Sequence, residues 1–141
     1  MPFRIAKSFT VESGHLLTKH AGGCRFPHGH SRTIEIVVAS DTLDTNDMVL
    51  DFKALKSAAA DLIARFDHTF ALNTADPRFP EFRAAYGDRV IPFDNTDPTT
   101  EVLARELFCL LQQRLAAAAT PARLERIRVT ETSSSWAEYW E

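Results

Sequence analysis

Apolar and polar residues alternate along two stretches in the first third of the chain. From Phe3 to Val11 the apolar residues occupy odd positions, interrupted by Lys7, and His15 ends the series. After a loop that contains glycine, even positions take over from His28 to Val38. A period of two is typical of strands with one face in the core. The pattern therefore predicts a strand that ends at His15 and a second strand that begins at His28.

Two later stretches have the period of a helix. Asp51 can cap the first, and Asp97 followed by Pro98 can serve as the cap and first residue of the second. The apolar positions that predict these helices are Leu55, Ala58, Ala59, Leu62, Ile63 and Phe66, and then Leu103, Leu107, Leu110, Leu111 and Leu115. Between the helices, residues 73–96 form a long connection with several prolines, which we expect to be functional or irregularly packed.

The end of the chain returns to alternation. Ile127, Val129 and Glu131 predict a third strand, and residues 136–140 predict a short fourth strand. The predicted order is β-β-α-α-β-β, an α+β fold with an antiparallel sheet and both helices on one face. Such a sheet has two open edges, and the pairing of subunits into a closed barrel is one way to cover them.

Composition narrows the classes of function. The chain has 141 residues, of which 45% are hydrophobic and 25% charged, and a net charge of −3. These values fit one globular domain over residues 1–141, and without a basic excess we expect no nucleic-acid partner. We read no signal peptide and no membrane span in the sequence. The two cysteines, Cys24 and Cys109, are far apart, so we expect no disulfide and a cytoplasmic location.

Three histidines carry the clearest chemical signal. His28 and His30 are two residues apart, so a strand places both imidazoles on one face, and Gly29 leaves the opposite face uncrowded. His15 can approach them from the end of the neighbouring strand, whereas His20 falls outside the pattern and is expected to be exposed. Three neutral imidazoles with one open position are typical of a catalytic zinc site. Bound zinc would polarise a hydroxyl or carbonyl oxygen of a substrate.

Cys24 lies four residues before His28 in a glycine-flanked loop. A nearby cation would favour the thiolate, so Cys24 could be a metal ligand, a nucleophile or a general base. It could equally be a small buried hydrophobic residue. A fourth zinc ligand would close the site, and the role of Cys24 therefore decides between a structural and a catalytic zinc.

Two further places offer ionisable groups. Asp67 and His68 follow the first predicted helix, either as an acid–base histidine oriented by an aspartate or as a histidine favoured by the helix dipole. Their side chains can meet only in the turn after the helix, because sequence neighbours do not face each other on a helix. Glu131 shares the apolar face of its strand and needs a donor, either a heterocycle with two adjacent N–H groups or a salt-bridge partner.

Together these residues resemble the 6-pyruvoyl-tetrahydropterin synthase family over almost the whole chain. The matching segments are Ser13-Gly14-His15, Cys24-x-x-x-His28-Gly29-His30, Leu50-Asp51-Phe52-Lys53, Asp67-His68-Thr69 with Leu72-Asn73, Pro98-Thr99-Thr100-Glu101, and Glu131-Thr132 followed by Ala137-Glu138-Tyr139. The three-residue gap between Cys24 and His28 is similar to that of the bacterial 6-carboxy-tetrahydropterin synthase branch. Residues 73–96 are longer than expected for that branch, and Val102 stands where the family often has Asn.

The resemblance implies the tunnelling fold, in which subunits join their sheets into a barrel as a homohexamer, a dimer of trimers. It also implies a zinc cofactor and a role for each candidate residue. These residues are His15, His28 and His30 as zinc ligands, Cys24, Asp67 and His68 in catalysis, with Cys24 as the proton-transfer base, and Glu131, Thr99 and Thr100 in binding of the pterin ring.

The implied reaction converts 7,8-dihydroneopterin triphosphate to 6-carboxy-5,6,7,8-tetrahydropterin, acetaldehyde and triphosphate, on the route to queuosine and related 7-deazaguanines. A 6-pyruvoyl-tetrahydropterin synthase, or an enzyme that cleaves the dihydroneopterin side chain, is the alternative within enzymes. A structural zinc-binding module, closed by Cys24, is the alternative of a different class. The phosphate chain calls for basic residues, which the sequence by itself does not identify.

Overall fold

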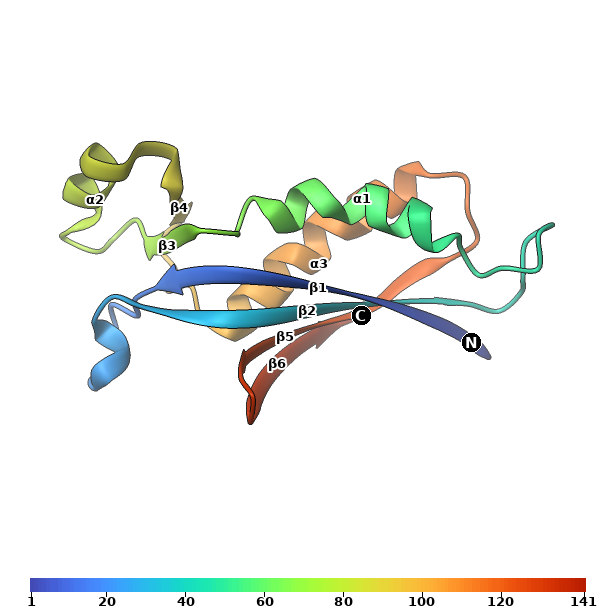
Figure 1. Cartoon of the computed structure of the whole chain (residues 1–141), viewed down its shortest axis with the longest axis horizontal. Helices are drawn as coiled ribbons and strands as arrows, with labels where there is room; N and C mark the ends of the chain where they lie inside the picture. Colours follow the sequence, from blue (N-terminus) through green and yellow to red (C-terminus); the bar gives the residue numbers. More distant parts are fainter.

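The computed structural model describes all residues, 1–141, as one curled six-stranded sheet with helices packed against it (Figure 1). The elements, in chain order, are β1 (Phe3–His15), the 3-10 turn η1 (Gly23–Arg25), β2 (His28–Ser40), α1 (Phe52–Ala64), β3 (Thr69–Asn73), α2 (Phe79–Tyr86), the 3-10 turn η2 (Gly87–Arg89), β4 (Val90–Phe93), α3 (Thr100–Ala117), β5 (Arg123–Thr132) and β6 (Ser135–Trp140). The strands lie in the order β4-β3-β1-β2-β5-β6. None of the helices combines the length and the hydrophobicity that crossing a membrane requires.

The two predicted N-terminal strands are confirmed as a long antiparallel pair. Their register runs from Phe3 opposite Ser40 to His15 opposite His28. The alternation of the sequence matches the two faces of this pair, because Val11 and His15 on β1 and Ile34 on β2 are buried. The register therefore brings the end of one buried face against the beginning of the other, which is where the histidines lie.

The connection between the two predicted helices contains secondary structure that the sequence pattern did not show. The predicted four strands and two helices are confirmed, and β3, α2 and β4 are added within or beside residues 73–96. β3 pairs in parallel with both β1 and β4, so the sheet is mixed rather than antiparallel throughout. Strands of four or five residues are too short for a clear period, and Pro92 argues against a strand. Because β4 is an edge strand, it can tolerate a proline.

Helices α1 and α3 cover the same face of the sheet, whereas α2 lies with β3 and β4 at one end (Figure 1). Residues of the two long helices, including Leu55, Leu107 and Phe108, are buried against apolar residues of β1, β2 and β5 in the main core. A smaller cluster of Leu16, Leu72 and Val90 is packed by aromatic residues of β3 and α2. Burial of these apolar faces fixes the ends of β1, β2 and β3 next to the start of α3.

One of the two predicted helix caps is confirmed, and the other is wrong. Asp51 caps α1 as predicted, accepting a hydrogen bond from the Lys53 backbone N–H at 2.7 Å. The prediction of Asp97 as the cap of α3 is wrong, because Thr99 accepts from the Val102 N–H and the helix begins at Thr100. The Asp97 carboxylate instead accepts from the backbone N–H groups of residues 18 and 19 and from the amide of Asn73. These distant donors bind the Asp97 carboxylate in place of the N–H groups of α3, and the contacts tie the loop after β1 to β3.

Candidate metal centre

Three imidazoles meet at the end of the β1–β2 pair. His15 is the last residue of β1, and His28 and His30 open β2. Their potential ligand atoms all lie within 4.8 Å of one another, and the Nε2 atoms of His15 and His30 are 3.2 Å apart. The predicted convergence of the three histidines is confirmed. The structure thus contains a cluster that could hold a metal ion.

Glycines allow the strands to approach at this point. Gly14 lies opposite Gly29 in the register of β1 and β2. A Cβ atom on Gly14 would lie 2.9 Å from the Phe70 ring, and one on Gly29 would lie 3.3 Å from the backbone oxygen of Ser13. Any side chain at Gly14 would therefore displace the Phe70 ring, and one at Gly29 would press on the backbone of β1.

Backbone carbonyl groups orient two of the imidazoles. His15 Nδ1 is 2.7 Å from the Pro98 oxygen, and His28 Nδ1 is 2.7 Å from the Phe26 oxygen. Because a carbonyl oxygen can only accept, each Nδ1 must carry the proton and donate. In a neutral ring this leaves the Nε2 lone pair free, which is the arrangement found in metal-binding histidines whose other nitrogen is held by the protein. The donor set therefore fits a divalent metal.

The surroundings of His15 and His30 favour the neutral form of the imidazole. Burial lowers the pKa of His15 from 6.5 to about 4, and the positive charge of Arg32 adds to this effect, whereas the bond to Pro98 opposes it. Burial also lowers the pKa of His30, again with Arg32, while Glu131 acts in the opposite direction. Neutral imidazole is the form that binds a metal.

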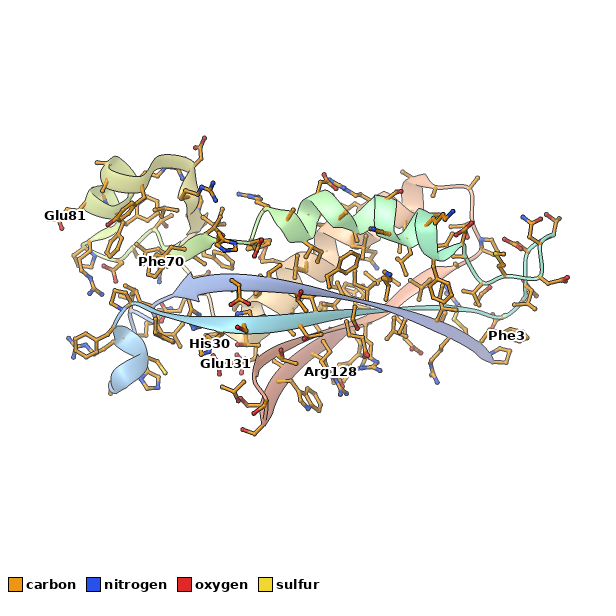
Figure 2. The ribbon with its side chains drawn as sticks, in the orientation of Figure 1. Phe3, His30, Phe70, Glu81, Arg128 and Glu131 are labelled. Atoms are coloured by element: carbon orange, nitrogen blue, oxygen red, sulfur yellow. The ribbon has the colours of Figure 1, made fainter.

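A carboxylate lies beside the histidines. Glu131 is near the end of β5, and its Oε1 is 3.6 Å from His30 Nε2 and 3.8 Å from His15 Nε2. Figure 2 shows His30 and Glu131 next to each other, on adjacent strands. Oε1 also accepts a hydrogen bond of 3.2 Å from the hydroxyl of Thr100. Of the two predicted threonines, Thr100 thus contacts Glu131, whereas the Thr99 side chain caps α3.

Arg32 belongs to the site and was missed from the sequence. It is 3% exposed, on the face of β2 that carries His28 and His30. It donates to the hydroxyl groups of Ser13 and Thr100, at 3.1 and 2.9 Å. A signal was present in the sequence, since Arg32 continues the even positions of β2 between His30 and Ile34.

The side chains of Asp67 and His68 meet in the turn after α1, as the interpretation of an oriented histidine requires. The two residues lie in the turn between α1 and β3, where His68 has a positive φ of 55°. This backbone bend brings His68 Nδ1 to 3.1 Å from Asp67 Oδ2. The backbone of Glu12 holds the pair by donating to Asp67 at 2.8 Å and accepting from His68 N–H at 2.6 Å. The hydrogen bond from Glu12, and next that from His68, lowers the pKa of Asp67.

Cys24 and the Asp67–His68 pair are not joined to the three histidines by any hydrogen bond or ion pair within the chain. Cys24 is half-buried in η1, and it is absent from the group of ligand atoms formed by the histidines. Its backbone oxygen accepts from Leu17 at 2.8 Å, which ties its loop to the end of β1. His20 is exposed, as expected.

Basic side chains gather next to Asp67. A pocket of about 490 Å³ is lined by Asp67 together with Arg65, Arg83 and Arg89. Arg83 donates to the Val90 carbonyl and Arg89 to the His68 carbonyl, whereas the Arg65 side chain makes no hydrogen bond or ion pair. Sequence reasoning did not find this group, because its members come from the end of α1, from α2 and from η2. Two of these elements lie in the segment predicted to be irregular.

Comparisons with known proteins agree over nearly the whole chain. The sequence model of a family described as 6-pyruvoyl tetrahydropterin synthase matches residues 4–141. The 6-carboxy-5,6,7,8-tetrahydropterin synthase of Aquifex aeolicus is 35% identical and aligns over 100% of this chain and 99% of its own length. The enzyme of the same name from Synechocystis is 31% identical, over 96% of this chain and 92% of its own.

Solved structures show the same fold at lower identity. A protein of Wolinella succinogenes superposes with a TM-score of 0.83 at 22% identity, over 99% of this chain and 98% of its own. A Plasmodium vivax 6-pyruvoyltetrahydropterin synthase superposes with a TM-score of 0.77 at 15% identity, over 99% and 97%.

Proposed function

The chain belongs to the 6-pyruvoyl tetrahydropterin synthase family, and from this premise we propose that it is a zinc-dependent carbon–carbon lyase of the 6-carboxytetrahydropterin synthase type. Its substrate would be 7,8-dihydroneopterin triphosphate, and its products 6-carboxy-5,6,7,8-tetrahydropterin, acetaldehyde and triphosphate. The relatives that bear this enzyme's name, at up to 35% identity over the full length, support the assignment. The route would be that to queuosine and related 7-deazaguanines, in the cytoplasm.

The observation that carries the proposal is the group of three histidines whose ligand atoms all lie within 4.8 Å of one another, with Nδ1 of His15 and of His28 held by backbone carbonyl groups. His15, His28 and His30 would hold zinc and leave one position for the substrate. When bound, zinc supplies Lewis-acid polarisation of the substrate's side-chain oxygens. A closed structural site would need Cys24 as a fourth ligand, and the cluster of ligand atoms does not include it. This arrangement favours an enzyme over a structural zinc module.

Other residues of the chain would bind the pterin and move protons. We assign to Glu131 the role of accepting hydrogen bonds from the N–H groups of the pterin ring. Its Oε2 makes no hydrogen bond in the chain, and Thr100 donates to its Oε1. Thr99 would assist through its place at the start of α3. We assign proton transfer on the substrate's side chain to Cys24 and His68, and the orientation of His68 to Asp67.

The arginine pocket next to Asp67 would receive the triphosphate. Guanidinium groups match phosphate oxygens in charge and geometry, and three of them line this pocket. Arg65 has no partner within the chain, so its donors are available to a ligand. The pocket also contains Asp67 and Asp88, which reduce its net charge but leave it positive.

A homohexameric barrel is the assembly that we propose. In the single chain, β4 and β6 are the two edges of the sheet, and Trp136 and Trp140 on β6 are 52% and 65% exposed. Unpaired edges with apolar side chains are favourable sites for pairing between subunits. Light scattering after size exclusion should give six times the mass of the chain, and a monomeric mass would contradict the barrel.

The decisive test is incubation of the zinc-loaded protein with 7,8-dihydroneopterin triphosphate, followed by mass analysis of the pterin and an assay for acetaldehyde. Formation of 6-carboxytetrahydropterin with acetaldehyde would support the proposal. A pyruvoyl product without acetaldehyde would assign the chain to the alternative within the family. Retained zinc with no turnover of any dihydroneopterin would favour a binding role.

A further inference from the structure

Arg32 is a buried cation with no carboxylate partner of its own. Its side chain is almost fully enclosed by β1, β2, β5 and the start of α3. None of the ion pairs in the chain includes Arg32. Its donors reach the Ser13 hydroxyl at 3.1 Å, the Thr100 hydroxyl at 2.9 Å and the Thr130 carbonyl at 3.4 Å. A buried charge is costly unless its surroundings compensate it, so this placement requires an explanation.

The position of one proton follows from this arrangement. A guanidinium group can only donate, so the Thr100 oxygen must accept from Arg32. The single hydroxyl proton of Thr100 is then left for the Glu131 Oε1 atom, 3.2 Å away. Arg32 thereby fixes the direction of the Thr100 hydroxyl, and a chain of two hydrogen bonds runs from the buried cation to the carboxylate.

This chain of hydrogen bonds runs from a cation, through a neutral hydroxyl, to an anion. Glu131, at the other end of the chain of hydrogen bonds through Thr100, supplies a negative charge that offsets the buried charge of Arg32. Oε1 of Glu131 thus accepts the Thr100 hydrogen bond and lies 3.6 Å from His30 Nε2 and 3.8 Å from His15 Nε2. Its Oε2 makes no hydrogen bond within the chain.

We propose that Arg32 is a positioning residue that acts through Thr100 to hold Glu131 with Oε1 turned toward the histidines and Oε2 free for the ring of the bound pterin. This inference rests on the proposed function, because it takes Glu131 to be the group that binds the pterin. It extends that function by naming the residue that sets the orientation of the carboxylate before the ligand arrives. Preorganisation of this kind increases affinity because less order has to be imposed on binding.

Loss of Arg32 should weaken pterin binding without loss of zinc. A positive charge beside a metal site opposes cation binding, so the removal of Arg32 takes no favourable charge away from the three histidines. Replacing Arg32 with Met should therefore leave zinc content at one per chain. A residue with only a structural role would, when removed, disturb the strand that carries His28 and His30 and so reduce zinc retention.

The test is a double-mutant cycle on the zinc-loaded protein, with 6-carboxypterin as the probe and fluorescence titration as the readout. Arg32→Met should weaken binding by about tenfold to a hundredfold, the scale of a lost hydrogen-bond network to a charged group. In a Glu131→Gln background the same change should have less than about a threefold further effect, because the group on which Arg32 acts is already altered.

A second pair of variants protects the test against failure of Arg32→Met to fold. Thr100→Val removes only the hydroxyl that links Arg32 to Glu131, and it should weaken 6-carboxypterin binding on the same scale, whereas Thr100→Ser should bind as wild type does. Equal affinity of Thr100→Val and Thr100→Ser, or equal losses for Arg32→Met with and without Glu131→Gln, would overturn the inference while the proposed function stands. A wild-type protein that does not bind 6-carboxypterin would overturn the proposed function and this inference with it.

Discussion

At the scale of single residues, the capacity of the three histidines to hold a metal depends on which nitrogen of each imidazole is already hydrogen-bonded. The carbonyl oxygens of Pro98 and Phe26 accept hydrogen bonds from the Nδ1–H groups of His15 and His28. A metal ion bound here would meet Nε2 atoms that are already aligned, and little rotational freedom would be lost on binding. The loss of any one histidine would leave two imidazoles, which are too few for a tight metal site.

Replacement of His28 by Ala should abolish retention of zinc and, with it, catalytic activity, because two imidazoles rarely hold catalytic zinc tightly. Metal analysis of the purified variant measures this, with His20→Ala as the matched control, since His20 is exposed and outside the cluster. Full zinc occupancy in His28→Ala would exclude the proposed ligand set.

Substitution of Cys24 distinguishes a role in catalysis from a role in metal binding. We expect Cys24→Ala to keep its zinc and its melting temperature but to lose turnover on the order of a hundredfold or more, the usual scale for a proton-transfer group. Cys109→Ala, which removes the exposed second cysteine, is the control and should remain active. If Cys24→Ala instead loses zinc and unfolds early, Cys24 is a ligand and the site is structural.

At the scale of elements, the β3–α2–β4 segment is held to the rest of the molecule by buried carboxylates. Asp76, whose side chain is fully buried, accepts from the Thr18 hydroxyl at 2.7 Å and from the Arg78 guanidinium at 3.1 Å. Asp97 makes the corresponding contacts to residues 18, 19 and 73. Both acids bind the loop after β1 to the added strands, and so they hold the arginine pocket next to the sheet.

The stability of this segment should depend on pH in the acid range. Arg78, and to a lesser degree Thr18, lowers the pKa of Asp76 from 3.8 to about 2. The ionised form is favoured in the folded state, so its contribution is complete above pH 3.8 and is lost as the pH falls toward 2. At about 1.4 kcal/mol for each pKa unit, Asp76 contributes about 2 kcal/mol to the free energy of unfolding.

Asp76→Asn should therefore be less stable than wild type by about 2 kcal/mol at pH 6, with a difference that shrinks between pH 4 and pH 2. Urea unfolding at several pH values measures this. Asp88→Asn is the control, because Asp88 pairs with Arg83 at 3.4 Å but is fully exposed and should change little. A difference that is constant over the pH range would contradict the role of the ionised Asp76.

The arginine pocket, which is lined from the end of α1, from α2 and from η2, allows a test of the proposed triphosphate site. Arg65→Ala should weaken the binding of inorganic triphosphate by about threefold to tenfold, because one charged donor is lost from a partly solvated site. Calorimetric titration measures the affinity, and Arg105→Ala, an exposed arginine on α3, is the control. Equal affinities of wild type and Arg65→Ala would place the triphosphate elsewhere. The fold should not change, since the Arg65 side chain has no partner in the chain.

At the scale of the whole molecule, the candidate metal centre lies where the β1–β2 pair meets the start of α3. His15 and His28 come from paired strands, and the carbonyl that orients His15 belongs to Pro98, just before α3. A metal bound here would join His15 to His28 and, through the hydrogen bond from His15 to Pro98, would tie both to the start of α3. Ligand binding to the folded state alone raises stability by mass action.

Removal of the metal should therefore lower the melting temperature. With zinc at about a thousand times its dissociation constant, the stabilisation amounts to about 4 kcal/mol. Thermal unfolding of zinc-loaded and chelator-treated protein measures the difference, and addition of zinc should restore it. His28→Ala should melt at the same temperature with and without zinc, and a zinc-dependent shift in that variant would show that another site binds the stabilising metal.

The sequence by itself determined the elements whose signals are local and repeated. The alternation from Phe3 to Val38 predicted β1 and β2, the spacing of Leu103 and its successors predicted α3, and the parity of His28 and His30 predicted that their rings share a face. These features follow from the fixed periods of strands and helices, so that a run of ten or more residues is sufficient to show them.

Only the tertiary structure decided the features that depend on distant partners. Asp97 does not cap α3, because N–H groups of residues 18 and 19 and the Asn73 amide bind its carboxylate. The short β3 and β4 exist because they pair with β1 and with each other, which no pattern within four or five residues reveals. Arg32 acquires its place because Thr100 and Ser13, from other elements, accept its hydrogen bonds inside the core. In each case the free energy comes from contacts between segments that the linear sequence keeps apart.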